Sequence, residues 1–312
     1  MSKLITRASS VNRALDQIGD KWCLLILQEV FWGINSFSEM LSATGVSRGV
    51  LAGRLKWLQS VDCLHKRSDG KGGKRLRYHL TRKSMDLYHC ALMAIAWERS
   101  FFNTPGLDEV ILVHRKCGMA FQPQMRCRDC NSELHAAEVS YQPGSGVATD
   151  EREKKVRRRS SLSLEDVPSS RSLYKNLINL VGDRWTANVI ALSFHGLTRF
   201  DQFHQELPIA TNILAHRLKL LVEGEVFRQS AYCDRPVRYE YMLTEKGEAL
   251  YPWFLALLQW GDKWCRPEGG GKPVRLKHLP CGRSLCAEVQ CGACGGVLKA
   301  QEVDFSLGAA TV

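Results

Sequence analysis

The fold is decided by residues 200–247, which read FDQFHQELPIATNILAHRLKLLVEGEVFRQSAYCDRPVRYEYMLTEKG. Apolar residues recur at helical spacing over 200–207 and 211–223, with a short turn between them. Residues 226–243 follow as two strand-like segments around a loop that contains proline, the pattern of a β-hairpin. Thr244 stands where the N-cap of another helix is expected. The order helix, turn, helix, hairpin, helix predicts a winged helix-turn-helix.

The chain contains this pattern twice. Gly19-Asp20-Lys21-Trp22 recurs 163 residues later as Gly182-Asp183-Arg184-Trp185, and the match continues to Trp97 and Trp260. A repeat of this length is a whole domain. The first copy predicts a helix over 12–31 that is interrupted at Gly19, helices over 37–41 and 47–60, and a hairpin with a glycine-rich tip over 63–80.

Each winged copy is followed by a short tail with the pattern H-x-x-C…C-x-x-C. Three thiolates and one imidazole suit a structural, tetrahedral Zn²⁺, so we expect two such ions, each held within one small zinc-ribbon-like β module. The ligands expected in the first tail are His114, Cys117, Cys127 and Cys130, and those in the second are His278, Cys281, Cys291 and Cys294. Reduced cysteines without metal, or a thiol switch that ejects zinc, are the alternatives.

The predicted fold class is mainly α with small β-sheets. The expected domains are a winged domain at 8–104, a Cys/His module at 107–141, a flexible basic linker at 142–169, a winged domain at 170–266 and a second Cys/His module at 274–307.

Charge and composition point to a polyanionic partner. The 312 residues carry a formal net charge of +11 and a pI near 9.1. There is no run of 18 apolar residues and no apolar leader segment, and the twelve cysteines suit a reducing compartment. We therefore expect a cytoplasmic, nucleoid-associated protein that contacts no membrane. No phosphate loop, nucleophile elbow or paired-carboxylate motif suggests an enzyme.

Several motifs together resemble one family. G-D-K-W, F-x-E-M-L, L-x-x-R-L-K-x-L, R-P-V-R-Y-E-Y-M-L-T-E-K-G and H-x-x-C-G…C-x-x-C resemble the HxlR-type branch of the MarR-like bacterial regulators. The resemblance implies dimeric DNA-binding repressors or activators, and this chain looks like two such subunits fused. Many members resemble one another in an N-terminal Cys-Pro that some use as a redox sensor. Ser9-Ser10 stand there instead, which puts a sensor of that type in doubt.

The second helix of each pair is expected in the major groove of double-stranded DNA. Opposite its leucine stripe, the second copy offers Asn212, His216 and Lys219, with Thr211 at the helix start and Arg217 on the flank. In the first copy the same face holds Gly49, Gly53 and Lys56, with Ser47 and Arg48 at the start and Arg54 on the flank. Glycine offers no base contact, so we expect the second copy to carry more of the base readout. The hairpins add phosphate contacts from Lys71, Lys74, Arg75, Arg235 and Arg238.

The leading hypothesis is a sequence-specific DNA-binding transcriptional regulator, expected to repress, that acts as a fused pseudo-dimer on an asymmetric operator. Its half-sites would lie about one helical turn apart. One alternative is a redox- or metal-responsive regulator whose zinc and thiol sites control DNA release. Another is a partly degenerate protein-interaction module. Further self-association of the chain and the identity of any small-molecule effector stay open.

Overall fold

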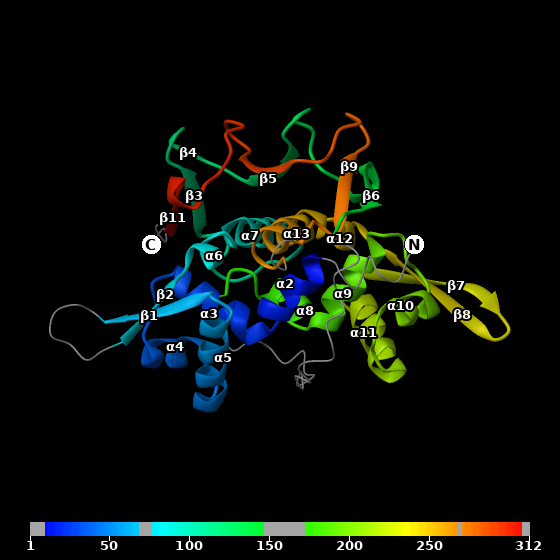
Figure 1. The fold of residues 1–312 in the computed structure, drawn as a ribbon, viewed down its shortest axis with the longest axis horizontal. Coiled ribbons are helices and arrows are strands. Elements are labelled where there is room, and N and C mark those ends of the chain that lie inside the picture. The colour runs from blue at the N-terminus through cyan, green and yellow to red at the C-terminus, as the bar shows by residue number, and fades with distance from the viewer. Residues whose placement is uncertain (1–9, 69–75, 147–171, 267–269, 308–312) are drawn as a thin grey trace. The chain divides into compact units, whose positions relative to one another are not determined.

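The computed structural model describes residues 10–68, 76–146, 172–266 and 270–307. Helices predominate and the strands form small two- and three-stranded sheets (Figure 1). The predicted class, mainly α with small β, is therefore confirmed. Within the described ranges, no helix combines the length and apolar character needed to cross a membrane.

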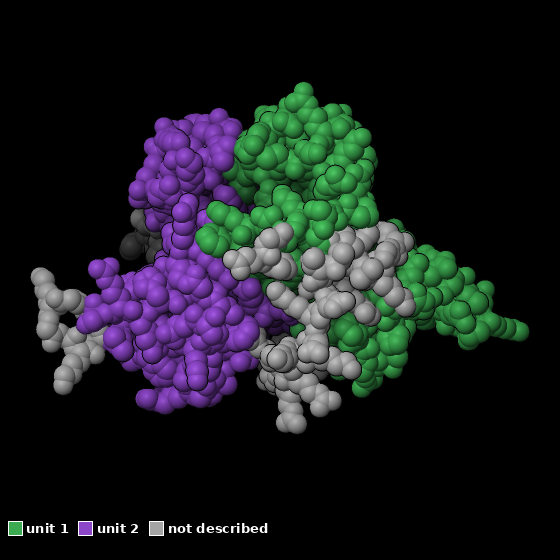
Figure 2. All heavy atoms as spheres, in the orientation of Figure 1, with its two compact units in different colours: residues 1–15, 124–158, 184–290 green, residues 16–123, 159–183, 291–312 purple. Residues whose placement is uncertain are grey.

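The chain divides into two compact units, and each unit contains segments of both sequence copies (Figure 2). Unit 1 comprises residues 1–15, 124–158 and 184–290, and unit 2 comprises 16–123, 159–183 and 291–312. The units therefore do not follow the order of the chain. The boundaries expected from the sequence stay predictions, and most of the expected linker, together with its basic run, lies outside the described residues.

Unit 2 contains the first winged domain, and local capping explains where its helices begin. Ser36 and Glu39 form a capping box at α4, and Gly45 ends that helix with a φ of 64°. Thr81 caps α6, because its side chain accepts from the Ser84 backbone N–H. The elements are α3 (Lys21–Phe31), α4 (Phe37–Thr44), α5 (Arg48–Ser60), β1 (Leu64–Ser68), β2 (Leu76–Leu80), α6 (Arg82–Met85) and α7 (Tyr88–Phe101).

Unit 2 also holds α8 (Lys175–Val181), which belongs by sequence to the second copy. The buried Glu98 carboxylate accepts from the backbone N–H groups of Asn176 and Leu177, so it binds the start of this helix. At the other end, a Cβ on Gly182 would lie 2.6 Å from the Lys21 Cβ. This close approach explains the glycine of the repeated G-D-K/R-W motif.

Unit 1 contains the second winged domain. Its predicted recognition helix, 211–223, is found with those bounds. Thr244 caps α12, as predicted. The elements are α9 (Arg184–Ser193), α10 (Phe200–Glu206), α11 (Thr211–Glu223), β7 (Phe227–Asp234), β8 (Val237–Leu243), α12 (Glu245–Glu248) and α13 (Tyr251–Trp264).

The first residues of α2 (Ser10–Ile18) belong to unit 1, although in sequence they lie in the first copy. Ser10 Oγ donates to Asp262 Oδ1 at 2.6 Å, and a Cβ on Gly261 would lie 2.2 Å from the Ser10 carbonyl oxygen. Glycine is thus required where α13 meets α2. The predicted helix over 12–31 is two helices, α2 and α3, separated at Gly19 and Asp20.

The tails exchange strands. In unit 2, β3 (Val110–His114) pairs with β4 (Met119–Ala120) and with β11 (Val303–Leu307), which comes from the second tail after the short η3 (Ala300–Glu302). In unit 1, β9 (Val274–His278) pairs with β6 (Val139–Pro143), which follows η1 (Ala136–Glu138) in the first tail (Figure 1). The remaining pair is β5 (Pro123–Cys127) with β10 (Ala287–Cys291).

Candidate nucleic-acid interface and metal centres

The two recognition helices bury the same leucine stripe and expose unlike faces. Leu51, Leu55 and Leu58 of α5 are buried, as are Leu214, Leu218 and Leu221 of α11. The opposite face of α11 exposes Thr211, Asn212, His216 and Lys219, and that of α5 exposes Arg48, Gly49, Gly53 and Lys56. The expected orientation of both helices is therefore found.

Arg54 lies on the flank of α5 but is held by a carboxylate. Its Nε and Nη2 donate to the two carboxylate oxygens of Asp20, each at 2.8 Å. Asp20 also accepts from the backbone N–H groups of Trp22 and Cys23, which makes it the N-cap of α3. Arg54 thus ties α5 to the start of α3, and a phosphate contact would compete with this bidentate pair.

Arg217 is expected on the flank of α11, but the residue is only 1% exposed. Its Nη1 lies 3.1 Å from His216 Nδ1. A guanidinium can only donate, so Nδ1 is the acceptor and the imidazole proton lies on Nε2. The exposed His216 therefore presents a hydrogen-bond donor on its outer nitrogen, and Arg217 is a positioning residue.

The starts of the two helices also differ. Ser47 is the N-cap of α5, and its side chain accepts from the Val50 backbone N–H at 3.4 Å. Ser47 is exposed, and this local bond gives it a structural role at the start of α5. Ala210 occupies the same position before α11 and offers no side-chain cap. The first N–H groups of α11 therefore remain suited to a phosphate oxygen.

The hairpins carry exposed basic side chains where the structure describes them. Arg228, Arg235 and Arg238 of β7, β8 and their turn are exposed, as are Lys66 and Arg67 of β1. Lys71, Lys74 and Arg75, expected as phosphate contacts in the first hairpin, lie outside the described residues.

The eight expected metal ligands form two clusters, but each cluster draws on both tails. His114 and Cys117 lie with Cys291 and Cys294, and Cys127 and Cys130 lie with His278 and Cys281. The expectation that one tail supplies all four ligands of its site is therefore wrong. The cause is the strand exchange, which brings the His-x-x-Cys turn of one tail to the Cys-x-x-Cys turn of the other.

All four ligand turns have the same local geometry. The residue after each second ligand has a positive φ: 70° at Gly118, 56° at Asn131, 69° at Gly282 and 70° at Gly295. Its backbone N–H donates to the carbonyl of the first ligand in the turn, at 2.8–2.9 Å. Glycine and asparagine tolerate this conformation, which explains the residue type at each place. The turn directs both ligand side chains to one point.

The donor sets fit a tetrahedral metal ion. In each cluster the ligand atoms all lie within 4.8 Å of one another. His114 Nδ1 is 3.3 Å from Cys294 Sγ and 3.6 Å from Cys117 Sγ, and His278 Nδ1 is 3.4 Å from Cys130 Sγ and 3.3 Å from Cys281 Sγ. Standard zinc bond lengths place such N and S atoms about 3.5 Å apart. Both clusters can therefore hold a metal ion.

The exposed ligand of each Cys-x-x-Cys turn is predisposed to ionise. A hydrogen bond from Ser132 lowers the pKa of Cys130 to about 6. Backbone donation from Gly296, followed by His114, lowers the pKa of Cys294 to about 7. Burial raises the pKa of their partners Cys127 and Cys291. The thiolate is the form that binds metal and the form that reacts with oxidants. Cys286 and His135 lie in neither cluster.

The chain is similar to known helix-turn-helix regulators. It is 39% identical over 127 residues to Rv3095 of Mycobacterium tuberculosis, an uncharacterised HTH-type transcriptional regulator. The aligned segment covers 40% of this chain and 79% of that protein. It is 34% identical over 94 residues to the HTH-type transcriptional regulator YodB of Bacillus subtilis, covering 30% of this chain and 84% of that protein. The crystal structure of PA1607, assigned as a transcription factor, is 32% identical with a TM-score of 0.38, covering 47% of this chain and 96% of that one.

The model of one protein family matches both halves of the chain. It is described as HxlR-like helix-turn-helix, and it matches residues 17–105 and 180–269. These two segments make up more than half of the 312 residues and contain both recognition helices. The chain belongs to the HxlR-like helix-turn-helix family, with two copies of the family's domain in one polypeptide.

Proposed function

We propose that this helix-turn-helix transcriptional regulator acts as a fused pseudo-dimer that binds an asymmetric DNA operator and represses transcription. One observation carries the proposal: the exposed face of α11 holds Asn212 and His216, where that of α5 holds Gly49 and Gly53. A homodimer presents two identical faces and suits a palindrome. Two unlike faces in one chain suit a site whose halves differ.

The chemistry of α11 defines what it would recognise. An asparagine amide donates and accepts at once, which matches the N6 and N7 edge of adenine. His216 presents its Nε2 proton, because Arg217 occupies Nδ1, and this donor suits the O6 and N7 acceptors of guanine. Asn212 and His216 are four residues apart on one helix face, so both can reach neighbouring base pairs of one groove.

The first copy would contribute position and affinity. Gly49 and Gly53 offer no side chain to a base, whereas Arg48, Lys56, Lys66 and Arg67 are exposed and positively charged. Such groups neutralise phosphates and release counterions without distinguishing sequences. We therefore assign base recognition chiefly to the second copy and sequence-independent affinity to the first.

Paired substitutions at equivalent positions test this assignment. Asn212→Ala should weaken binding to the native operator about tenfold or more, and it should leave binding to unrelated DNA nearly unchanged. Gly49→Ala, at the equivalent position of α5, is the control and should change neither affinity by more than about twofold. Equal losses on specific and unrelated DNA for Asn212→Ala would contradict the assignment. Reporter expression from a promoter that carries the operator then tests repression. If the protein represses, expression should be higher in its absence.

The two Cys/His clusters would each hold one structural Zn²⁺. The supporting observations are the three-thiol, one-imidazole donor sets, the N···S spacing and the buried His114 and His278. When bound, zinc would join segments distant in sequence. Metal analysis of the purified chain should find about two equivalents of zinc.

A second candidate function is a redox-responsive regulator. The observation that favours it is the exposure of Cys130 and Cys294 together with their lowered pKa values. Oxidation of these thiols by hydrogen peroxide should then release zinc and operator DNA at the same peroxide dose. Zinc and DNA retained after the exposed thiols are oxidised would exclude this role while leaving the operator proposal intact.

A further inference from the structure

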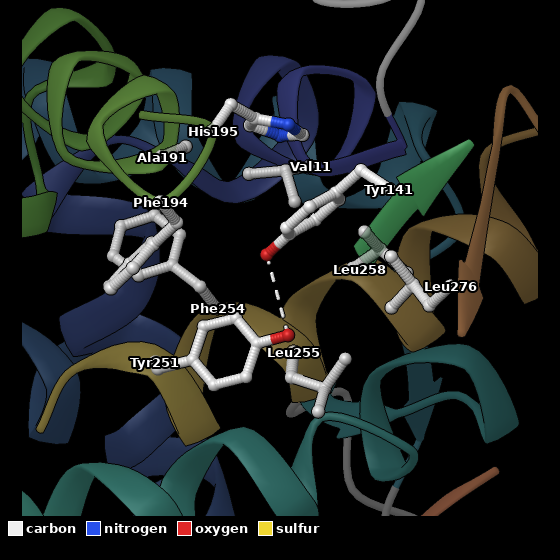
Figure 3. Close-up of a pocket in the computed structure, with 10 residues that line it drawn as sticks. All are labelled: Val11, Tyr141, Ala191, Phe194, His195, Tyr251, Phe254, Leu255, Leu258 and Leu276. Carbon is white, nitrogen blue, oxygen red and sulfur yellow. Dashed lines mark hydrogen bonds between the residues drawn. The ribbon is translucent and has the colours of Figure 1, made fainter. Parts of the chain in front are cut away.

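Unit 1 contains an aromatic cavity that DNA binding does not use (Figure 3). Its volume is about 30 Å³, and it lies among α9, α13, the start of α2 and the paired strands β6 and β9. Phe194, Phe254 and Tyr251 form one side, where the Phe194 ring contacts each of the other two rings edge to face. The remaining lining residues are Val11, Tyr141, Ala191, His195, Leu255, Leu258 and Leu276.

Three polar groups meet this apolar lining. Tyr141 donates to the Tyr251 hydroxyl at 3.3 Å, and Figure 3 shows the two hydroxyls pointing toward each other. The His195 ring lies 4.1 Å from the Tyr141 ring, centroid to centroid. Its Nδ1 is buried and has no hydrogen-bond partner among the described residues. Burial lowers the pKa of His195 to about 4, so the imidazole is neutral near pH 7 and can accept a hydrogen bond.

The equivalent place in unit 2 is built differently, although the chain is duplicated. Trp32 stands where unit 1 has His195, Phe305 where it has Tyr141, and Tyr174 where it has Val11. Trp32 and Phe305 pack against each other at 5.7 Å between ring centroids. Each replacement adds bulk or removes a polar group. The contact between a histidine and a tyrosine, His195 with Tyr141, is therefore a property of unit 1 and not of the shared fold.

We propose that this cavity binds a small neutral molecule with one aromatic ring and one hydroxyl group, of the phenol class. Among the residues that the structure describes, no Asp, Glu, Lys or Arg lines the cavity, which disfavours a charged ligand. The rings and aliphatic side chains suit an aromatic ring. The ligand hydroxyl donates to His195 Nδ1, which otherwise remains a buried acceptor without a partner.

Ligand entry requires a local movement. A volume of about 30 Å³ is enough for a water molecule but less than one aromatic ring needs. His195 is partly exposed and lies in the turn after α9, which ends at Gly196 with a φ of 83°. Outward movement of this turn makes the space. Because α9 packs against the recognition helix α11, occupancy should lower DNA affinity; this part rests on the proposed function.

Direct binding can be measured without DNA. In fluorine NMR titrations of the full chain, para-fluorophenol should bind saturably, para-fluorotoluene several-fold more weakly, and para-fluorobenzoate not measurably. His195→Trp installs the residue of the first copy and should weaken fluorophenol binding about tenfold or more. Trp32→His at the equivalent place in unit 2 is the control and should leave binding unchanged. Thermal unfolding checks that both variants fold. If His195→Trp does not fold, Leu258→Phe, which narrows the cavity from α13, replaces it as the cavity variant.

The outcomes separate the two proposals. Fluorophenol binding that is absent, or that is equal in the parent and both cavity variants, overturns the site. Saturable binding that leaves operator affinity unchanged overturns the regulatory role and keeps the site. If the ligand site and its regulatory role are both correct, saturating fluorophenol lowers operator affinity about fivefold or more in the parent and has no such effect in His195→Trp. A chain that binds fluorophenol but no DNA would contradict the proposed function alone.

Discussion

Gly53 shows at the scale of one residue how the two copies have diverged. It lies in the middle of α5 with its Cβ position open to solvent, at the place where α11 has His216. Gly53→Ala should stabilise the chain by about 0.5–1 kcal/mol, because alanine loses less backbone freedom in a helix. Urea unfolding measures the change. A destabilised variant would show that the Cβ position of Gly53 on α5 is not open to solvent.

Asp20 combines two roles in one carboxylate, since it caps α3 and accepts both bonds from Arg54. Asp20→Ala should cost about 1–3 kcal/mol of unfolding free energy. Asp304→Ala is the matched control, because the Arg115–Asp304 pair is exposed on both sides and solvent screening leaves such a pair little effect on stability. Comparable losses for the two variants would contradict the role given to Asp20.

His195 should make stability depend on pH in a defined window. Its folded pKa is lowered to about 4 by burial, below the value of about 6.5 for an unfolded chain. The unfolded state therefore takes up the proton first, and stability is lost as pH falls from about 6.5 towards 4. Urea unfolding across this range should show a smaller loss for His195→Trp than for the parent. Parallel curves would mean that His195 titrates normally.

The leucine stripes of both recognition helices could be predicted from spacing alone, but the surroundings of individual arginines could not. A helical wheel puts Arg54 and Arg217 at equivalent angles. One is bonded to Asp20 and the other is almost fully buried. Which of the two outcomes occurs depends on the elements packed against the flank, and these come from distant parts of the chain.

At the scale of elements, the strand exchange between the tails leads to a prediction about which metal ligands share an ion. The four ligands of one ion come either from both tails or from a single tail. Cys117 and Cys294 lie in the same cluster, whereas Cys117 and Cys130 lie in different ones. The double variant Cys117→Ser with Cys294→Ser should therefore keep about one of two bound zinc ions, and Cys117→Ser with Cys130→Ser should lose both. Metal analysis by mass spectrometry distinguishes the variants. The reverse pattern would mean that each tail binds its own ion.

The sequence could supply the eight ligands but not this grouping. Both tails carry the same His-x-x-Cys and Cys-x-x-Cys turns, so either pairing satisfies a tetrahedral ion equally well. The choice follows from strand pairing, with β11 on β3 and β6 on β9. Pairing between strands so far apart in the chain leaves no local pattern in the sequence.

At the scale of the whole molecule, the mixed composition of the units predicts that the two copies cannot be separated by cutting the chain. Cleavage at a protease site inserted within 147–171 leaves a fragment that supplies α3 to α7 and a fragment that supplies α8 and β11 of the same unit. The fragments should therefore elute together in gel filtration. Separate elution of two folded fragments would show that each copy is an autonomous domain.

The central claim is that the two recognition helices contribute unequally to sequence recognition. The most direct test measures the affinity of the native chain for its operator with every base pair substituted in turn. The account predicts that substitutions in one half-site cost about tenfold or more, that those in the other half-site cost little, and that Asn212→Ala removes the difference. Equal stringency in both half-sites would contradict it.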